Sequence, residues 1–233
     1  MPELMLVVEF DIPAGCVGDF KAAAAPVIEA TSAEPGTLRY DWHLSEDGLR
    51  DLNLERFEDA AAFVIHDRHV APIVPPLNAV ASLRRFCVMG DPSDDVRAQL
   101  AAVDVQYYRH LSGIERQPGG AITLLLDLDI KPGRLDEFTL AARALVDRAA
   151  PEPGTLGYDF WISEDQARVR VTEVYANAAA FLAHDANAQV RVAALLETCT
   201  ISGSEVVGDP GEARAALVRP TRVFFSYFSG IAR

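Results

Sequence analysis

The chain has 233 residues, half of them hydrophobic, and a formal net charge of -13. This length allows one large domain or two small ones, and the apolar content is enough for a substantial core. The negative charge argues against nucleic acid or an anionic membrane as a partner, because both select positively charged proteins.

The start of the chain and its cysteines favour a cytoplasmic protein. No basic segment precedes the first apolar stretch, which Glu9 and Asp11 interrupt, so we expect no signal peptide. No run approaches the roughly 20 apolar residues that a membrane span needs. The cysteines Cys16, Cys87 and Cys199 are odd in number and far apart, which is typical of free thiols in a reducing cytosol.

The first half of the chain is predicted to mix strands and helices in the order βαββαβ, followed by an extension. Pro-Ala-Gly ends the first strand, Glu-Pro-Gly ends the first helix, and Ser-Glu-Asp-Gly separates the next two strands. This order is the ferredoxin-like split βαβ arrangement, an antiparallel sheet with helices on one face. In chain order we expect strand 4–12, helix 17–30, strands 37–44 and 50–57, helices 59–66 and 71–83, strand 84–89, helix 93–101 and strand 105–111.

The second half repeats the first at an offset of 118 residues. EPGTLRYDWHLSED at residues 34–47 matches EPGTLGYDFWISED at residues 152–165, and the runs AAAF and HD recur at the same offset without a gap. We therefore expect two domains of one fold, residues 1–117 and 118–233, joined at the turn-forming segment 117–120.

The second strand of each copy indicates what each face of its sheet carries. Along residues 37–44, an apolar set that includes Tyr40 and Trp42 alternates with a polar set that includes Asp41 and His43. We expect the apolar set to pack under the helices. Strand one lacks the clean alternation of a solvated face, so the helix-free faces of the two sheets are expected to pack together as a barrel with helices outside, lined by the polar set.

The repeated pattern G…F…EPGTL.Y…SED…E…AAAF…HD resembles the antibiotic biosynthesis monooxygenase (ABM) domain of the dimeric α+β barrel superfamily. The resemblance implies an α+β fold: tandem ferredoxin-like units whose antiparallel sheets pack face to face as an intramolecular dimeric α+β barrel. It also implies an oxygenase that needs no cofactor, with O₂ as co-substrate and a quinol or anthrone as substrate. Deprotonation of such a substrate gives a carbanion that passes an electron to O₂ directly. Other members of this superfamily degrade haem or have no assigned role.

Histidines and carboxylates that recur in both copies are the first candidates for proton transfer. His66 and His184 follow the Ala-rich helices and could accept a proton, oriented by Glu55 or Glu173. The structural alternative is a histidine that favours the C-terminal end of a helix dipole. Glu55 and Glu173 could equally make buried structural hydrogen bonds.

The second group of candidates would line the barrel. Asp41 and His43 in the first copy correspond to Asp159 and Trp161 in the second. An aspartate in a dry cavity could act as a base with a raised pKa, and the alternative is a solvated carboxylate. Trp161 would form an aromatic wall for the substrate. Tyr40 and Tyr158 would complete this wall.

His69 lies three residues after His66, on the same side of a helix, but a metal site would need a further ligand. The second copy has Asn187 at this position, so we expect His69 to contact substrate or solvent and expect no metal. The catalytic set predicted from the sequence is His66, Asp41, His43 and Glu55.

The competing hypothesis is a non-enzymatic module that binds a hydrophobic ligand or haem. Haem would need an axial ligand, and His66, His69 and His184 are the candidates. The expected partner is a small aromatic molecule under either hypothesis. The sequence leaves open whether the fused pair associates further into a homo-oligomer.

Overall fold

The computed structural model describes residues 3–115, 121–219 and 221–232. The chain divides into two compact units, unit 1 (Met1–Tyr107 with Phe225–Arg233) and unit 2 (Tyr108–Phe224). The content is mixed α+β, as predicted. No helix within the described ranges is long and apolar enough to cross a membrane.

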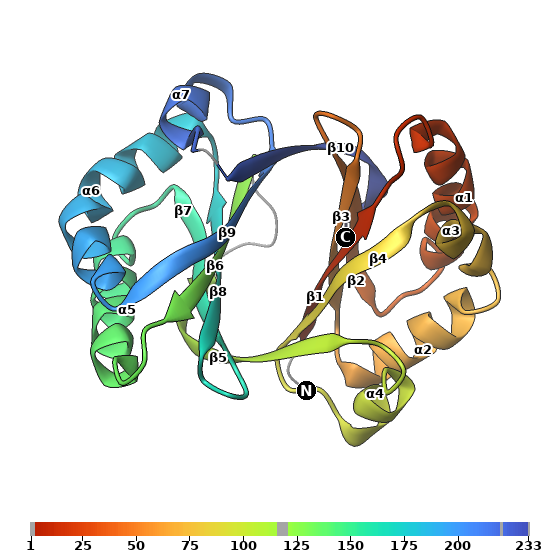
Figure 1. The fold of residues 1–233 in the computed structure, drawn as a ribbon, viewed down its shortest axis with the longest axis horizontal. Coiled ribbons are helices and arrows are strands. Elements are labelled where there is room, and N and C mark those ends of the chain that lie inside the picture. The colour runs from red at the N-terminus through yellow and green to blue at the C-terminus, as the bar shows by residue number, and fades with distance from the viewer. Residues whose placement is uncertain (1–2, 116–120, 220, 233) are drawn as a thin grey trace. The chain divides into compact units, whose positions relative to one another are not determined.

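Unit 1 is an antiparallel sheet with helices on one face. Its elements are β1 (Leu4–Asp11), α1 (Val17–Thr31), β2 (Thr37–Ser45), β3 (Arg50–Phe57), α2 (Ala60–Val70), α3 (Pro75–Val80), β4 (Ser82–Met89), α4 (Asp94–Gln99) and most of β10 (Arg222–Ala232). The strands are hydrogen-bonded in the order β4-β1-β3-β2-β10. Figure 1 shows α1, α2 and α3 on the same face of this sheet.

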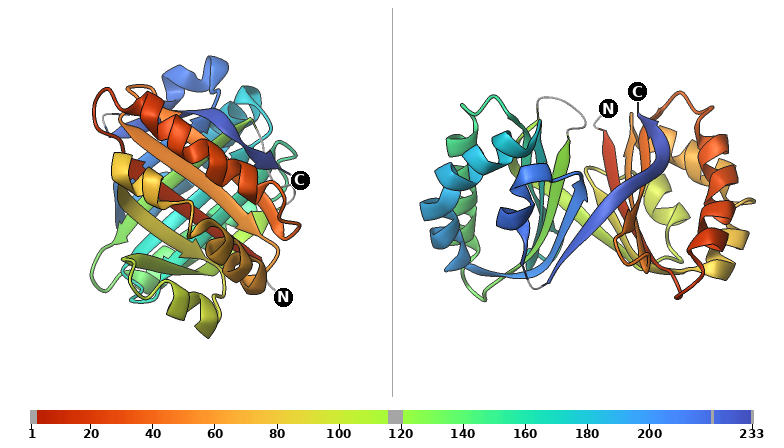
Figure 2. Two further views of the ribbon diagram at one scale, coloured as in Figure 1. Left: turned by 90° about the vertical axis from the view of Figure 1, so that its right-hand side faces the viewer. Right: turned by 90° about the horizontal axis from the view of Figure 1, so that it is seen from above.

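Unit 2 repeats the arrangement. Its elements are most of β5 (Val105–Glu115), β6 (Ile122–Ile130), α5 (Leu135–Ala149), β7 (Thr155–Ser163), β8 (Arg168–Tyr175), α6 (Ala178–Leu196), β9 (Cys199–Gly208), η1 (Gly211–Ala213) and α7 (Arg214–Leu217). Its strand order is β9-β6-β8-β7-β5. Figure 2 shows α5 and α6 together on one face of this sheet.

The last strand of each sequence half belongs to the sheet of the other half. β5, predicted to complete the first half, pairs with β7, and β10 pairs with β2. Each exchanged strand covers what would otherwise be the open edge of β2 or β7. Within each unit the strands form an antiparallel sheet of the ferredoxin-like type, as the fold class predicts. The expected join at 117–120 lies outside the described residues, so the domain boundaries stay a prediction.

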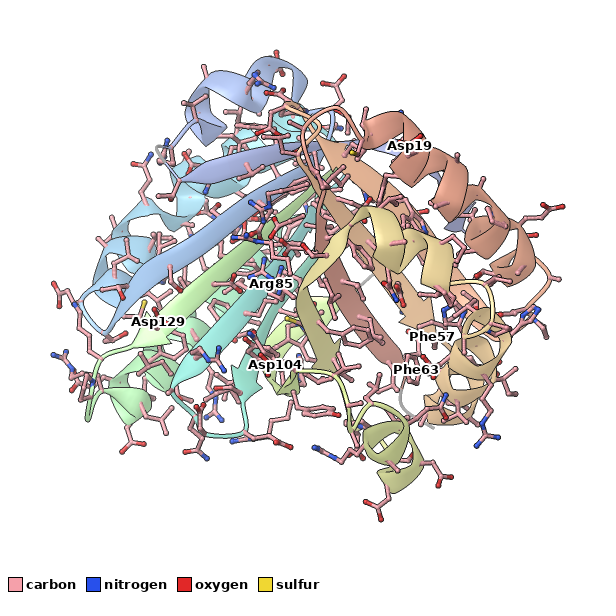
Figure 3. The ribbon with its side chains drawn as sticks, turned by 45° about the vertical axis from the view of Figure 1, so that its right-hand side comes forward. Asp19, Phe57, Phe63, Arg85, Asp104 and Asp129 are labelled. Atoms are coloured by element: carbon pink, nitrogen blue, oxygen red, sulfur yellow. The ribbon has the colours of Figure 1, made fainter. Side chains whose placement is uncertain are left out.

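Strand register determines which side chains of unit 1 face the helices. β3 pairs with β2 so that Tyr40 is opposite Glu55, Trp42 opposite Asn53, and Leu44 opposite Asp51. Directly opposite residues share a face of the sheet. Phe57, on the same side of β3, packs against Phe63 of α2 with ring centroids 5.4 Å apart. Figure 3 shows this ring pair between strand and helix, and Arg85 on the opposite, helix-free side of the sheet.

The helices over the two sheets differ in one respect that the sequence prediction missed. α6 is continuous over 19 residues, whereas α2 ends at Val70 and only the short α3 remains of the predicted helix 71–83. Pro72, Pro75 and Pro76 occupy this stretch of unit 1. Proline cannot donate the backbone hydrogen bond of a helix interior, so the cover over the sheet is interrupted in unit 1.

The repeated Glu-Pro-Gly and Ala-rich motifs meet in space. A Cβ atom added to Gly36 would lie 2.7 Å from the Cβ of Ala62 in α2, and one added to Gly154 would lie 2.5 Å from that of Ala180 in α6. The capping residue Asp59 fixes the start of α2 by accepting a hydrogen bond of 2.9 Å from the Ala62 nitrogen. The glycine is therefore required because the helix lies directly against the turn.

We expect Gly36→Ala to lower the free energy of unfolding by about 1–3 kcal/mol, the usual cost of overpacking. In the double variant Gly36→Ala/Ala62→Gly the loss should be smaller than the sum of the two single losses, because the clashing methyl group is absent. Urea unfolding of the four proteins measures this interaction. Gly18→Ala is the control, because nothing lies within 4 Å of its added Cβ. Additive losses would show that the two motifs do not constrain each other.

Candidate active site

A polar cluster lies on the helix-facing side of the sheet in unit 1. It consists of Trp42 on β2 and of Asp51, Asn53 and Glu55 on β3, and these four side chains are between 0% and 6% exposed. Buried polar side chains normally have hydrogen-bond partners, because leaving water without one is costly. Polar residues at successive inward positions of one strand therefore call for an explanation.

Most of this cluster has no hydrogen-bond partner. Among the described residues, no atom hydrogen-bonds to Trp42 Nε1, to either carboxylate oxygen of Asp51 or to Asn53 Oδ1. A donor and several acceptors are thus buried within one small region of the β2–β3 hairpin. Unsatisfied buried polar groups that gather in this way mark a candidate functional site.

Aromatic rings surround the indole of Trp42. The ring centroids of Phe10, Phe20, Tyr40 and Phe228 lie 6.5, 5.9, 5.7 and 6.3 Å from that of Trp42. These rings come from β1, α1, β2 and β10. An apolar and aromatic surround with a few polar groups is the usual composition of a site for a small organic molecule.

Burial changes the ionisation of both carboxyl groups in the cluster. Burial raises the pKa of Asp51 well above its ordinary value, and the nearby Glu9 and Glu55 charges raise it further. Both causes favour the protonated form of Asp51. Burial also raises the pKa of Glu55 to about 7, although the charge of His66 opposes this shift. A carboxyl group that titrates near neutral pH suits general-base catalysis.

His66 and His69, both on α2, share one carboxylate. His66 Nδ1 lies 2.9 Å from Glu34 Oε2, and His69 Nδ1 lies 2.7 Å from Glu34 Oε1. Thr37 donates a hydrogen bond of 2.7 Å to Glu34 Oε2. Burial alone would raise the pKa of Glu34, but the hydrogen bonds from His66, Thr37 and His69 outweigh it and lower that pKa. The His66 ring also packs against aromatic rings of the sheet. It contacts the rings of Tyr40 and Phe57, each with its centroid 5.0 Å from that of His66.

Unit 2 keeps the histidine and the glutamates but not the unsatisfied cluster. Trp42, Asp51 and Asn53 correspond at the 118-residue offset to Phe160, Val169 and Val171. These three apolar residues are buried together in the core of unit 2, with Tyr158 and Phe138. The space that holds unsatisfied polar groups in unit 1 is ordinary hydrophobic core in unit 2.

The glutamates that recur in the two units also differ in their surroundings. Tyr175 donates a hydrogen bond of 2.5 Å to Glu173 Oε2. In unit 1 the residue matching Tyr175 is Phe57, which has no hydroxyl group to donate. Burial raises the pKa of Glu173, while His184 and the Tyr175 hydrogen bond lower it. Glu55 therefore lacks the hydrogen bond that holds Glu173 in place.

The candidates predicted to line a barrel lie on the helix-free sides of their own sheets. In unit 1, Arg39 donates a hydrogen bond of 2.6 Å to Asp41. His43 Nδ1 lies 3.1 Å from the Leu52 carbonyl oxygen, and burial lowers the pKa of His43 to about 4. This imidazole is therefore neutral at pH 7, and it does not lie on the side of the sheet that carries His66 and Glu55.

In unit 2 the equivalent side holds Asp159 and Trp161. His110 of β5 lies 3.0 Å from Asp159, measured from Nε2 to Oδ1, and its ring centroid is 5.0 Å from that of Trp161. Trp161 Nε1 donates a hydrogen bond of 3.2 Å to Thr172. Trp161 does not join Tyr158 in one wall, because side chains alternate between the two faces of a strand and these residues are three positions apart on β7.

The structure divides the predicted catalytic set into two pairs. His66 and Glu55 lie together between the sheet and the helices, near Tyr40, whereas Asp41 and His43 lie on the other side of β2.

The sequence prediction does not include two residues of the polar cluster, Asp51 and Asn53. The sequence does contain a sign of them in the third strand of each copy. RDLNLERF of the first copy aligns with RVRVTEVY of the second, and it has an aspartate and an asparagine where the second copy has two valines.

Comparison with known proteins identifies the family. The model of the antibiotic biosynthesis monooxygenase family matches residues 4–71 and 121–194, more than half of the chain. The chain belongs to this family. It contains two tandem ABM domains, and the first includes the whole polar cluster. This membership supports the predicted assignment as a monooxygenase, an oxidoreductase that acts on a small molecule.

Solved structures agree on the ABM fold. A candidate monooxygenase from Lactobacillus acidophilus NCFM is 16% identical, with a TM-score of 0.59 and coverage of 88% of this chain and 92% of that one. One from Fusobacterium nucleatum subsp. nucleatum is 15% identical, with a TM-score of 0.63 and coverage of 88% and 89%. An anthrone oxidase-like protein is 12% identical, with a TM-score of 0.52 and coverage of 93% and 97%. No curated protein matches the chain.

Proposed function

We propose that the protein is a cofactor-independent monooxygenase that oxidises a small aromatic substrate of the anthrone or quinol type with O₂. We place the reaction in unit 1, between the β2–β3 hairpin and the helices. The observation that carries this proposal is the buried group of unsatisfied atoms on Trp42, Asp51 and Asn53. The anthrone oxidase-like structure among the fold relatives is consistent with the substrate class.

The polar cluster offers what the first chemical step requires. An anthrone loses a proton from carbon and places the negative charge on its carbonyl oxygen. Glu55, with a pKa of about 7, is the proposed base. Trp42 Nε1–H and the protonated Asp51 carboxyl group are the proposed donors to the developing oxyanion. Donors that are in place before the charge forms stabilise it at little cost in reorganisation.

The remaining steps balance without an external reductant. The substrate anion transfers one electron to O₂, and the resulting radical pair combines to form a carbon–oxygen bond. Protonation gives a hydroperoxide, which loses water as the second proton leaves the same carbon. A CH₂ group and O₂ thus become a C=O group and H₂O, and all four electrons come from the substrate. The rings of Phe10, Phe20, Tyr40 and Phe228 provide an apolar surround for the aromatic substrate.

Oxygen uptake by the dialysed protein tests the proposal. With an anthrone or a naphthohydroquinone we expect one O₂ consumed per product, no accumulation of hydrogen peroxide and no stimulation by added flavin or haem. The absence of uptake across such a panel would contradict the proposal. A Soret band after haem is added, without oxygen uptake, would favour the alternative of a non-enzymatic haem-binding module.

A further inference from the structure

The series His66–Glu34–His69 connects the buried side of unit 1 with solvent. His66 is 4% exposed, whereas the side chain of His69 is 47% exposed. The two imidazoles use different oxygens of Glu34, at 2.9 Å and 2.7 Å. The carboxylate therefore bridges one ring inside the protein and one ring at its surface.

The inner end of this series reaches the surroundings of Glu55. The His66 ring is 5.0 Å from both Tyr40 and Phe57, measured between centroids. Tyr40 lies directly opposite Glu55 across the β2–β3 pair, and Phe57 is two residues further along the same face of β3. The imidazole thus packs over the strand positions that flank the Glu55 side chain.

We propose that His66, Glu34 and His69 form a proton path between Glu55 and solvent. This inference rests on the proposed function, because Glu55 must first take a proton from the substrate. The path connects the substrate proton with bulk water during the lifetime of the substrate anion. The outer member, His69, is the residue that makes the exchange with solvent.

Each transfer along the path moves one proton and no electrons. Glu55 passes its proton to His66 at Nε2, and His66 releases a proton from Nδ1 to Glu34 Oε2. Rotation of the protonated Glu34 carboxyl group presents this proton to Nδ1 of the Nε2–H tautomer of His69, and the resulting imidazolium releases its Nε2 proton to water. The hydrogen bonds at 2.9 Å and 2.7 Å hold the two oxygens of Glu34 in line with the two imidazoles between which the proton moves. The same steps in reverse return a proton to the site.

Unit 2 contains the same geometry with the outer step removed. His184 Nδ1 lies 2.7 Å from Glu152 Oε2, and Asn187 donates a hydrogen bond of 2.5 Å to Glu152 Oε1. Thr155 donates to Glu152 as Thr37 does to Glu34. An amide group can hold the carboxylate in place but does not accept and release protons near neutral pH. The replacement of histidine by asparagine therefore separates the structural role from proton transfer.

The test is anaerobic hydrogen–deuterium exchange at the acidic carbon of 9-anthrone in D₂O, followed by NMR. Without O₂ the substrate anion can only be reprotonated, and deuterium enters when the abstracted proton has escaped to solvent. We expect His69→Asn to slow the enzyme-catalysed exchange about 10-fold or more. Oxygen uptake should fall less, because oxidation releases no net proton. Added imidazole should restore exchange.

The matched control is Asn187→His in unit 2, which should leave both rates unchanged. Exchange by His69→Asn at the wild-type rate, or a loss that imidazole does not restore, would overturn the proton path. Wild-type protein that neither exchanges nor oxidises any substrate would instead contradict the proposed function, so the two failures are distinguishable.

Discussion

Asp51→Val is expected to stabilise the protein and remove its oxygenase activity. Asp51 is a buried carboxyl group with no hydrogen-bond partner among the described residues, and valine is the residue at the matching position 169. Removing an unsatisfied buried polar group should raise the free energy of unfolding by about 1–3 kcal/mol. Losing a donor to the oxyanion should lower kcat by about 100-fold or more.

Urea unfolding and oxygen uptake measure the two effects on one preparation. The reciprocal variant Val169→Asp is the control, and it should destabilise unit 2 without affecting the chemistry of unit 1. A stability gain coupled to an activity loss is the pattern of a functional residue whose presence is costly to the fold. An Asp51→Val protein that is less stable than wild type and fully active would contradict this role.

Glu55→Gln is expected to lower kcat/KM by about 10²–10⁴-fold, the usual contribution of a positioned base. The pKa of Glu55 is raised to about 7 by burial, and only the ionised carboxylate can accept a proton. The wild-type pH profile of kcat/KM should therefore rise as the pH increases through about 7. The matched variant Glu173→Gln in unit 2 should retain activity, because its site is filled core. Equal losses in both variants would show that the two halves share the reaction.

The same shift predicts how stability depends on pH. The folded pKa of Glu55 lies above its ordinary value of 4.5, so between these values the folded state keeps a proton that the unfolded state loses. The contribution of Glu55 is therefore most favourable below pH 4.5 and declines until about pH 7, by on the order of 3 kcal/mol. Urea titrations at pH 5 and pH 8 should show a smaller decline in Glu55→Gln than in wild type. An equal decline in the two proteins would contradict the shift.

Much of the fold could be predicted because the sequence contains two similar copies of one domain. Internal agreement at one offset predicts the strands, the first helix of each copy and the resemblance to the ABM family. The exchange of β5 and β10 could not be predicted in this way. The two strands resemble each other, so sequence similarity alone does not say which sheet each one joins.

The candidate site was only half predicted, for a reason that lies in the alternation of strands. His66 and Glu55 stood out because both copies keep them, and both lie beside the polar cluster. Asp51 and Asn53 are missing from the second copy, so a search for repeated residues passes over them. The prediction of Asp41 and His43 depends on a site on the helix-free side of the sheet. The unsatisfied atoms lie on the helix-facing side instead.

The most direct test of this account uses the two tryptophans of the chain, Trp42 and Trp161. Their indole N–H signals in a ¹H–¹⁵N NMR spectrum can be assigned with Trp42→Phe and Trp161→His, the residues that the opposite copy carries. Trp42 Nε1 has no hydrogen-bond partner among the described residues, whereas Trp161 Nε1 donates to Thr172. Titration with an anthraquinone, the product class of the proposed reaction, should shift the Trp42 signal and leave the Trp161 signal in place. A shift of the Trp161 signal with Trp42 unchanged would place the ligand on the helix-free side of unit 2 and contradict the site in unit 1.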